Sequence, residues 1–401
     1  MKKPFHFSIT ARLDGTLART GLIHTPHGDI QTPAFIVVGT KAAVKAMVPE
    51  QVKAVHAQAV LANAYHLYLQ PGHKLVASAG GLGKFMHWDG PTFTDSGGFQ
   101  VLSLGSGFKK VLAMGTEVDP TQAIAIKSSR HAWVDDDGVK FKSHLDGSIH
   151  RFTPEVSMRV QHAIGADITF AFDELTSLLD PYEYQVESLA RTHKWAERSL
   201  AEVQRLREQN PDRPYQALFG VLQGANYEDL RKETAHFMAE HDFDGYGIGG
   251  ALEKENMAQI IQWVNEILPE DRPRHLLGIS EPDDIFAAIE QGIDTFDCVS
   301  PTRVGRNGSG YTYHGRINIT GARYKGDFSP IIDDCECYTC QHYTLAYLNH
   351  LFRAKETLAG TLVSIHNEHF IIKLVDDIRA SIANGTFYEF RDAWLREYYA
   401  K

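Results

Sequence analysis

The sequence predicts an α/β fold, a (β/α)8 or TIM barrel, with a small subdomain inserted near the C-terminus. Eight apolar segments of strand length occur along the chain, and stretches with helical periodicity lie between them. The strand candidates are continuous apolar runs, as expected for parallel strands that helices cover. Several end in a polar residue or a glycine, and the carboxyl ends of barrel strands carry the functional groups in such folds. We therefore expect residues 1–401 to form a single barrel unit.

Each element is predicted by its own local signal. After a strand-like opening, the strand candidates are residues 32–39, 59–67, 92–98, 166–175, 217–224, 245–250, 275–280 and 294–300. The helix candidates with the clearest starts are residues 154–164, 182–206, 227–240 and 283–291. Thr153-Pro154 and Pro282 are typical helix starts, because a threonine caps the first turn and a proline there loses no hydrogen bond.

Two regions do not follow the alternation. Residues 105–150 are predicted to be an extended hairpin insertion, with Asp137-Gly138 as its turn and Lys140–Leu145 as its returning strand. Residues 309–345 come after the eighth strand and form a small β-rich insert. The tail, residues 341–400, has mostly amphipathic helical patterns.

Composition limits the classes of function. The 401 residues are 43% hydrophobic and 22% charged, which is ordinary for a soluble globular enzyme. The net charge of −10 excludes a protein that binds nucleic acid over its whole surface. Residues 298–326, however, contain several arginines and a lysine without any acidic residue, so they form either a polyanion-binding patch or a solvated surface stretch. The N-terminus has no apolar run typical of a signal peptide and no segment has 18 consecutive apolar residues, so we expect a cytoplasmic protein without a membrane partner.

Three of the four cysteines lie close together. Cys335, Cys337 and Cys340 are followed 26 residues later by His366, and three thiolates with one imidazole are a ligand set for tetrahedral zinc. A full set of four protein ligands leaves no position for a reactive water, so one structural Zn²⁺ per chain is predicted, within a zinc-binding subdomain at residues 309–370. The alternatives are a reduced cysteine cluster without metal, or a different histidine ligand: His342, His350 or His369.

The polar residues at the predicted strand ends are the candidate site. They are Asp95, Asp173, Gln223, Gly250 and Asp297. Asp297 precedes a proline-containing loop that carries two arginines, so a carboxylate nucleophile beside guanidinium groups suits a phosphate-bearing substrate. Taken singly, these residues are better explained structurally: Asp95 as a turn cap, Asp173 as a helix-start acid, Asp297 as a hydrogen-bonded loop residue and Gln223 as an amide at the edge of the core.

Taken together, these motifs resemble the tRNA-guanine transglycosylases of the bacterial queuosine pathway. The resemblance rests on the order and spacing of several segments over nearly the whole chain. They are TDSGGFQVLSL at 94–104, FKSHLDGS at 141–148, FDE at 172–174, LFGVLQG at 218–224, GYGIGG at 245–250, FDCVSPTRVGRNG at 296–308 and the cysteine and histidine set.

The resemblance implies a zinc-containing barrel, usually a homodimer, that exchanges wobble guanine in GUN anticodons for a 7-deazaguanine, normally preQ1. It implies that Asp297 is the nucleophile and Asp95 the general acid/base. Ser96, Asp173, Gln223 and Gly250 would hold the purine, and Phe99 would stack on it. Arg303 and Arg306 would bind the anticodon loop of the tRNA.

Some positions depart from the family pattern near the outer side of the pocket. Leu175 stands where the family usually has a cysteine, and Glu281 stands where a lysine is common. Residues 251–256 lack the leucine that usually follows the glycine pair, and residues 105–138 form a longer segment than the family usually has. The incoming base is therefore either preQ1 or queuine taken up by salvage. A non-catalytic tRNA-binding subunit is a further alternative, although both carboxylates are present. An unrelated barrel hydrolase with two carboxylates is disfavoured by the basic stretch and the complete zinc ligand set.

Overall fold

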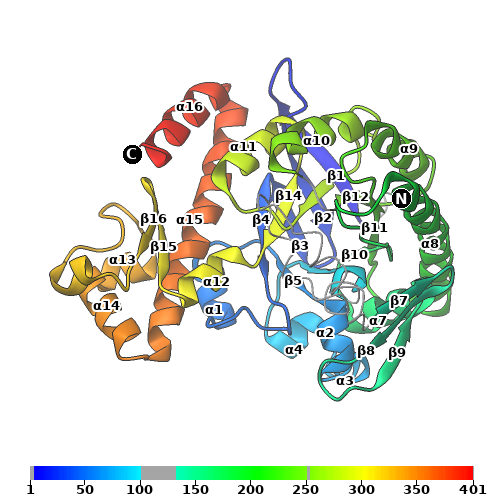
Figure 1. Cartoon of the computed structure of the whole chain (residues 1–401), viewed down its shortest axis with the longest axis horizontal. Helices are drawn as coiled ribbons and strands as arrows, with labels where there is room; N and C mark the ends of the chain where they lie inside the picture. Colours follow the sequence, from blue (N-terminus) through cyan, green and yellow to red (C-terminus); the bar gives the residue numbers. More distant parts are fainter. Residues whose placement is uncertain (1–3, 101–131, 251–252, 401) are drawn as a thin grey trace.

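The predicted barrel is confirmed. The computed structural model describes residues 4–100, 132–250 and 253–400, and eight parallel strands close into a barrel in which β14 pairs with β4 and β6 with β10 (Figure 1). The barrel strands are β4 (Ala34–Val38), β5 (Val60–Ala62), β6 (Thr92–Thr94), β10 (Ile168–Phe170), β11 (Ala217–Leu222), β12 (Gly245–Ile248), β13 (Arg274–Leu277) and β14 (Thr295–Cys298).

Helices surround this barrel. The helices between the strands are α1 (Pro49–Ala54), α2 (Ala64–Leu69), α3 (His73–Ser78), α4 (Leu82–Met86), α7 (Pro154–Ile164), α8 (Tyr182–Gln209), α9 (Glu228–Ala239), α10 (Met257–Asn265) and α11 (Pro282–Glu290). The four with predicted starts, α7, α8, α9 and α11, begin within one residue of the predicted position. The bounds predicted for α7 are confirmed. Thr153 caps this helix, since its Oγ1 accepts a hydrogen bond from the Val156 amide.

The strands are shorter than predicted. The candidate at residues 59–67 is a strand only at Val60–Ala62, and its last residues begin helix α2. The Asp95 carboxylate accepts the amide of Ala64, one of the unpaired amides at a helix start, so a side chain from the next strand favours the helix here.

A three-stranded antiparallel sheet closes the amino end of the barrel. It consists of β1 (His6–Arg12), β2 (Arg19–Thr25) and β3 (Gly28–Thr32), and its apolar side chains join the core inside the barrel. Arg19 of β2 forms a fully buried ion pair with Asp294, directly before β14. The amino ends of the strands are thus sealed, and the polar residues lie at the other end.

The hairpin insertion is partly described. Strands β7 (Ala132–Asp135), β8 (Gly138–Lys142) and β9 (Ile149–Phe152) form an antiparallel sheet, while residues 101–131 lie outside the described part of the chain. The returning strand ends at Lys142 rather than at the predicted Leu145, because Ser143 begins a turn in which its hydroxyl accepts the Leu145 amide.

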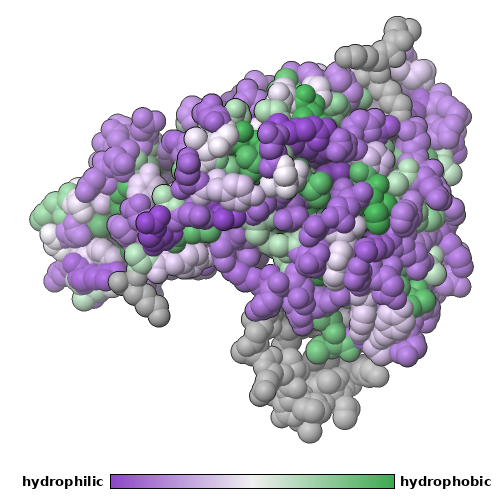
Figure 2. Space-filling model, turned by 90° about the horizontal axis from the view of Figure 1, so that it is seen from above, coloured by the Kyte–Doolittle hydropathy of each residue, from purple (hydrophilic) through white to green (hydrophobic). Residues whose placement is uncertain are grey.

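The C-terminal part builds a lobe beside the barrel (Figure 1). It contains α12 (Ser300–Arg306), β15 (Ser309–Thr312), β16 (Gly315–Asn318), α13 (Tyr338–His342), α14 (Leu345–Arg353), α15 (Thr357–Asn384) and α16 (Phe387–Tyr398). Helix α15 contacts β4 of the barrel as well as α12, α13 and α14, and it is apolar on most sides. Seen from above, the lobe projects from the barrel and the visible face is largely hydrophilic (Figure 2).

The prediction of a proline-containing loop after Asp297 was wrong. Residues Ser300–Arg306 form helix α12, with Pro301 in its first turn, where the absent amide proton would have no helical partner. Among the helices that the structure describes, none combines the length and apolar character needed to cross a membrane.

Candidate active site and metal centre

Asp297 is held at the carboxyl end of β14 by the neighbouring strand. His275 Nε2 lies 3.0 Å from Asp297 Oδ1, and the Gly278 amide donates to the same oxygen at 3.3 Å. The imidazole is fully buried and its Nδ1 lies 2.9 Å from Thr295 Oγ1. The imidazole therefore bridges the Asp297 carboxylate and the Thr295 hydroxyl. Asp297 thus has a fixed orientation while its side chain stays 15% exposed.

Asp95 lies near Asp297, and both residues are partly exposed. Its carboxylate accepts the Ala64 amide at 2.7 Å and the side-chain amide of Asn63. Burial raises the pKa of Asp95 to about 6, and the negative charge of Asp297 contributes to that rise. A carboxyl group with such a pKa can both release and take up a proton near neutral pH.

A second polar group lies beside these carboxylates. Ser96 Oγ donates to Asp173 Oδ1 at 2.9 Å, and Gln223 Nε2 donates to Asp173 Oδ2 at 2.7 Å. Burial raises the pKa of Asp173 to about 6. Gly250, at a φ of +97°, borders Gln223, and a Cβ there would approach Gln223 Oε1 to 2.9 Å. The three side chains therefore form one connected group of donors and acceptors, as expected for a pocket that binds a polar planar ligand.

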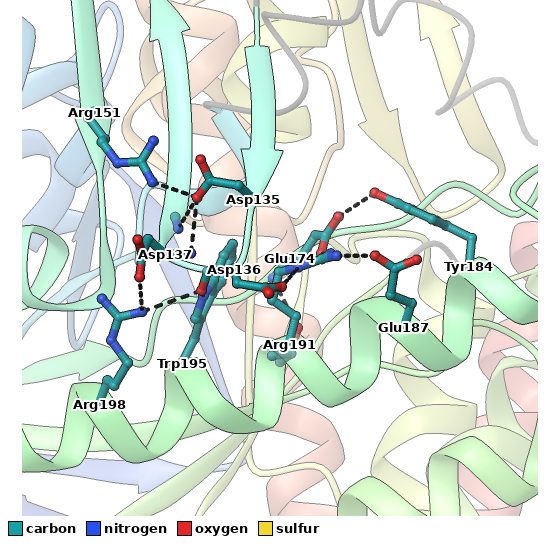
Figure 3. Close-up of polar contacts among 12 residues, drawn as sticks. Asp135, Asp136, Asp137, Arg151, Glu174, Tyr184, Glu187, Arg191, Trp195 and Arg198 are labelled. Carbon is teal, nitrogen blue, oxygen red and sulfur yellow. Dashed lines mark hydrogen bonds and ion pairs between the residues drawn. The ribbon is translucent and has the colours of Figure 1, made fainter.

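The residue after Asp173 anchors this segment (Figure 3). Glu174 is 1% exposed, forms an ion pair with Arg191 of α8 and accepts the Tyr184 hydroxyl at 2.6 Å. Arg191 also faces Asp136 in the hairpin turn, whose carbonyl accepts Trp195 Nε1 at 2.8 Å. Helix α8 therefore fixes both the Asp173 segment and the hairpin sheet. This structural role explains why the Glu174 carboxylate is buried.

Phe99 and four cations lie around the mouth of the barrel. Phe99 is 39% exposed, just beyond Ser96. Burial lowers the pKa of Lys45, and the positive charges of Arg306, Arg303 and Lys41 lower it further. Arg303 and Arg306 belong to α12. Arg303, Arg306 and Lys41 thus lie near Lys45, and the four cations form one basic group.

Several of these contacts lay beyond sequence reasoning. His275 stood inside a predicted strand with only its polarity as a signal, and Asn63 was taken as part of a strand. Lys41 and Lys45 follow the end of the first barrel strand, which is the signal that could have identified them.

The three cysteines and His366 come together as predicted. Their ligand atoms all lie within 4.8 Å of one another, and His366 Nδ1 is 3.8, 3.5 and 3.3 Å from the sulfurs of Cys335, Cys337 and Cys340. Ligands at ordinary zinc bond lengths in a tetrahedron would be about 3.5 Å apart from nitrogen to sulfur. His366 Nε2 donates to the Tyr311 carbonyl at 2.8 Å, which fixes the ring with Nδ1 toward the thiols. The group could therefore hold one metal ion.

Asp173→Asn is expected to stabilise the protein above pH 6. The pKa of Asp173 in the folded state, about 6, lies above the ordinary 3.8. Protonation of Asp173 therefore adds to the free energy of unfolding in full below about pH 4, and this contribution is lost as the pH rises through 6. Ionised Asp173 then costs up to about 3 kcal/mol. Asparagine would keep the Ser96 bond through its oxygen, and it would donate to Gln223 Oε1 once the Gln223 amide turns over.

Thermal unfolding of wild type and variant at pH 5 and pH 8 measures this effect. The difference in Tm should be larger at pH 8. Asp212→Asn, an exposed carboxylate at the amino end of the barrel, provides the control. Equal differences at both pH values would contradict the raised pKa.

Comparisons with known proteins agree on one family. A family model described as "Queuine tRNA-ribosyltransferase" matches residues 14–400. A queuine tRNA-ribosyltransferase of Pelotomaculum thermopropionicum is 44% identical over 98% of both chains. Similar proteins with the same name occur in Caldanaerobacter subterraneus, at 44% identity over 96% of this chain and 95% of that one, and in a Roseiflexus species, at 45% over 97% and 98%.

Proposed function

This chain belongs to the queuine tRNA-ribosyltransferase family, the tRNA-guanine transglycosylases, and from this premise we propose that it exchanges the wobble guanine of GUN anticodons for preQ1 in queuosine biosynthesis. The observation that carries the proposal is the group of residues at one end of the barrel. Two carboxylates, Asp297 and Asp95, lie there beside the connected set Asp173, Ser96 and Gln223.

Base recognition follows from the donors and acceptors of guanine. Ionised Asp173 can accept from the ring N–H and the amino group of the base. Gln223 Nε2 and the backbone near Gly250 can donate to the carbonyl oxygen of the base, once Nε2 is released from Asp173. Phe99 supplies an aromatic face for stacking, and a wobble base in a loop leaves its stack at small cost.

The exchange proceeds by two displacements at C1′ of the ribose. Asp297 attacks C1′ while the bond from C1′ to the guanine nitrogen breaks, and the base leaves with the bonding electrons and takes a proton from Asp95. Asp95 then removes a proton from the incoming base. Its nitrogen attacks C1′, and the bond between C1′ and Asp297 breaks, which restores the carboxylate with overall retention. The pKa of about 6 at Asp95 suits both proton transfers.

Arg303, Arg306, Lys41 and Lys45 are proposed to bind the phosphates of the anticodon loop. Each phosphate contact to single-stranded nucleic acid contributes about −0.7 to the slope of log affinity against log salt concentration. Lys41→Met is therefore expected to weaken tRNA binding at low salt and to flatten this slope by about 0.7. Filter binding across a salt series measures it, and an unchanged slope would remove Lys41 from the contact set.

We propose that the cysteine and histidine group holds one structural Zn²⁺. Four protein ligands complete the tetrahedron, so the ion would stabilise the lobe and take no part in base exchange. A homodimer is also proposed from the resemblance, and Phe328, Tyr338 and Tyr347 are exposed aromatic side chains on the lobe that could contribute to an interface. Sedimentation velocity would test it, and a monomer at micromolar concentration would reject it.

The decisive test is release of labelled guanine from a GUN-anticodon tRNA with preQ1 and queuine offered separately. Release with preQ1 alone supports the proposal, and release with queuine alone supports the salvage alternative. Absence of release with both bases from folded, metal-loaded protein would favour the non-catalytic subunit.

A further inference from the structure

Arg231 is a buried cation next to the proposed base pocket that no step of the exchange uses. It lies on α9 and is 0% exposed. Its Nε donates to the Ala225 carbonyl at 2.8 Å, and its Nη1 donates to the carbonyls of Gly249 at 2.9 Å and Leu222 at 3.3 Å. No described carboxylate forms an ion pair with it, and burial alone lowers its pKa to about 9. A buried charge held only by carbonyls is costly and requires an explanation.

The explanation begins with two unpartnered atoms. Arg231 Nη2 is buried without a hydrogen-bond acceptor, and Gln223 Oε1 is buried without a donor. Both atoms lie 2.9 Å from the position that a Cβ on Gly250 would occupy, so they border the same small space. A guanidinium N–H and an amide oxygen are complementary partners.

We propose that Arg231 is a positioning residue that orients the Gln223 amide when a base binds. A base that bonds to Asp173 displaces Gln223 Nε2 from that carboxylate. The amide then moves so that Oε1 accepts from Arg231 Nη2 and Nε2 faces the carbonyl oxygen of the base. This inference rests on the proposed function for the identity of the base.

The same geometry accounts for two further features. The glycine at 250 leaves open the space between the two side chains, which any Cβ would fill. The Arg231 bond to the Gly249 carbonyl holds the backbone that is proposed to donate to the base. One guanidinium thus fixes the side-chain donor and the backbone donor together.

A double-mutant cycle on guanine affinity tests the proposal. Isothermal titration calorimetry with guanine is carried out on wild type, Arg231→Lys, Gln223→Met and the double variant, each checked for folding and metal content. Arg231→Lys should weaken guanine binding about tenfold, because a hydrogen bond from a charged group is lost. The double variant should lose clearly less affinity than the product of the two single losses, because Arg231 acts in large part through that amide.

Arg274→Lys is the matched control. Arg274 is also buried and donates to carbonyls, of Asn265 at 3.1 Å and Leu268 at 3.0 Å, but it begins β13 at the amino end of the barrel. Its substitution should leave guanine affinity unchanged. A structural role for Arg231 would instead give additive losses with Gln223→Met, and additivity overturns the proposal.

A structure of the wild type with guanine provides a second test that depends on no variant. Arg231 Nη2 and Gln223 Oε1 should then lie within hydrogen-bond distance, and an amide turned the other way overturns the inference. If the wild type binds guanine but the cycle is additive, only this inference fails. If the wild type binds no guanine, the proposed function fails with it.

Discussion

Asp297→Asn is expected to lower base exchange by about 10³-fold or more, because an amide cannot form the bond to C1′ on which the reaction depends. Asparagine has nearly the same shape and can still accept from His275 and from the Gly278 amide through Oδ1. The fold, the metal content and the guanine affinity should therefore stay close to those of the wild type. Exchange is measured as release of labelled guanine from tRNA.

Two measurements separate the nucleophile from a supporting carboxylate. Wild-type protein mixed with tRNA should give an adduct that survives denaturing electrophoresis, and Asp297→Asn should give none. Asp212→Asn should retain both the adduct and the exchange rate. A variant at position 297 that still exchanges guanine at near wild-type rate would reject the assignment, and Asp95 would become the next candidate.

The barrel could be predicted from the sequence because its signals are local. Eight apolar runs and the helix starts at Thr153 and Pro282 need no knowledge of distant contacts. The lengths of the elements depend on such contacts. The segment after Val60 becomes helical because Asp95, more than thirty residues later, accepts the Ala64 amide. Pro301 was interpreted as a loop residue, since a proline signal alone does not distinguish a helix start from a break.

The site divides in the same way. Asp95, Asp173, Gln223 and Asp297 stood at strand ends, so the barrel topology brought them together. The residues that orient these side chains lie inside strands or on helices. His275 gave no periodic signal, and Arg231 had the sequence context of an ordinary helix residue, so only the folded chain reveals that their polar groups face the site.

Cys337→Ser is expected to remove the metal and to loosen the C-terminal lobe. A serine hydroxyl is a poor zinc ligand, because zinc sites of this type depend on thiolates. The cysteine and histidine group brings the cysteine loop against His366 of α15, and the neighbouring Asn367 donates to the carbonyls of Pro301 and Ser309 at 3.0 Å. Helix α12, with Arg303 and Arg306, therefore packs on the helix that carries His366, which the proposed metal would anchor.

This connection predicts different effects on the two ligands. Loss of the metal should weaken tRNA binding at least about tenfold, because the phosphate-binding cations lose their fixed position. Guanine affinity should change less than about twofold, because the base-binding residues follow β6, β10, β11 and β12, whereas helix α15 of the lobe packs on β4. Metal content by mass spectrometry, calorimetry with guanine and filter binding with tRNA measure the three quantities.

Histidine variants provide the control for the ligand set. His366→Ala should lose the metal as Cys337→Ser does, whereas His342→Ala should keep it, because the His342 ring is exposed and bonds to the Tyr338 carbonyl. Full metal retention in His366→Ala would reject the ligand assignment. Equal losses of guanine and tRNA affinity in Cys337→Ser would mean that the lobe stabilises the whole barrel, so the metal would act on the fold rather than on the tRNA surface.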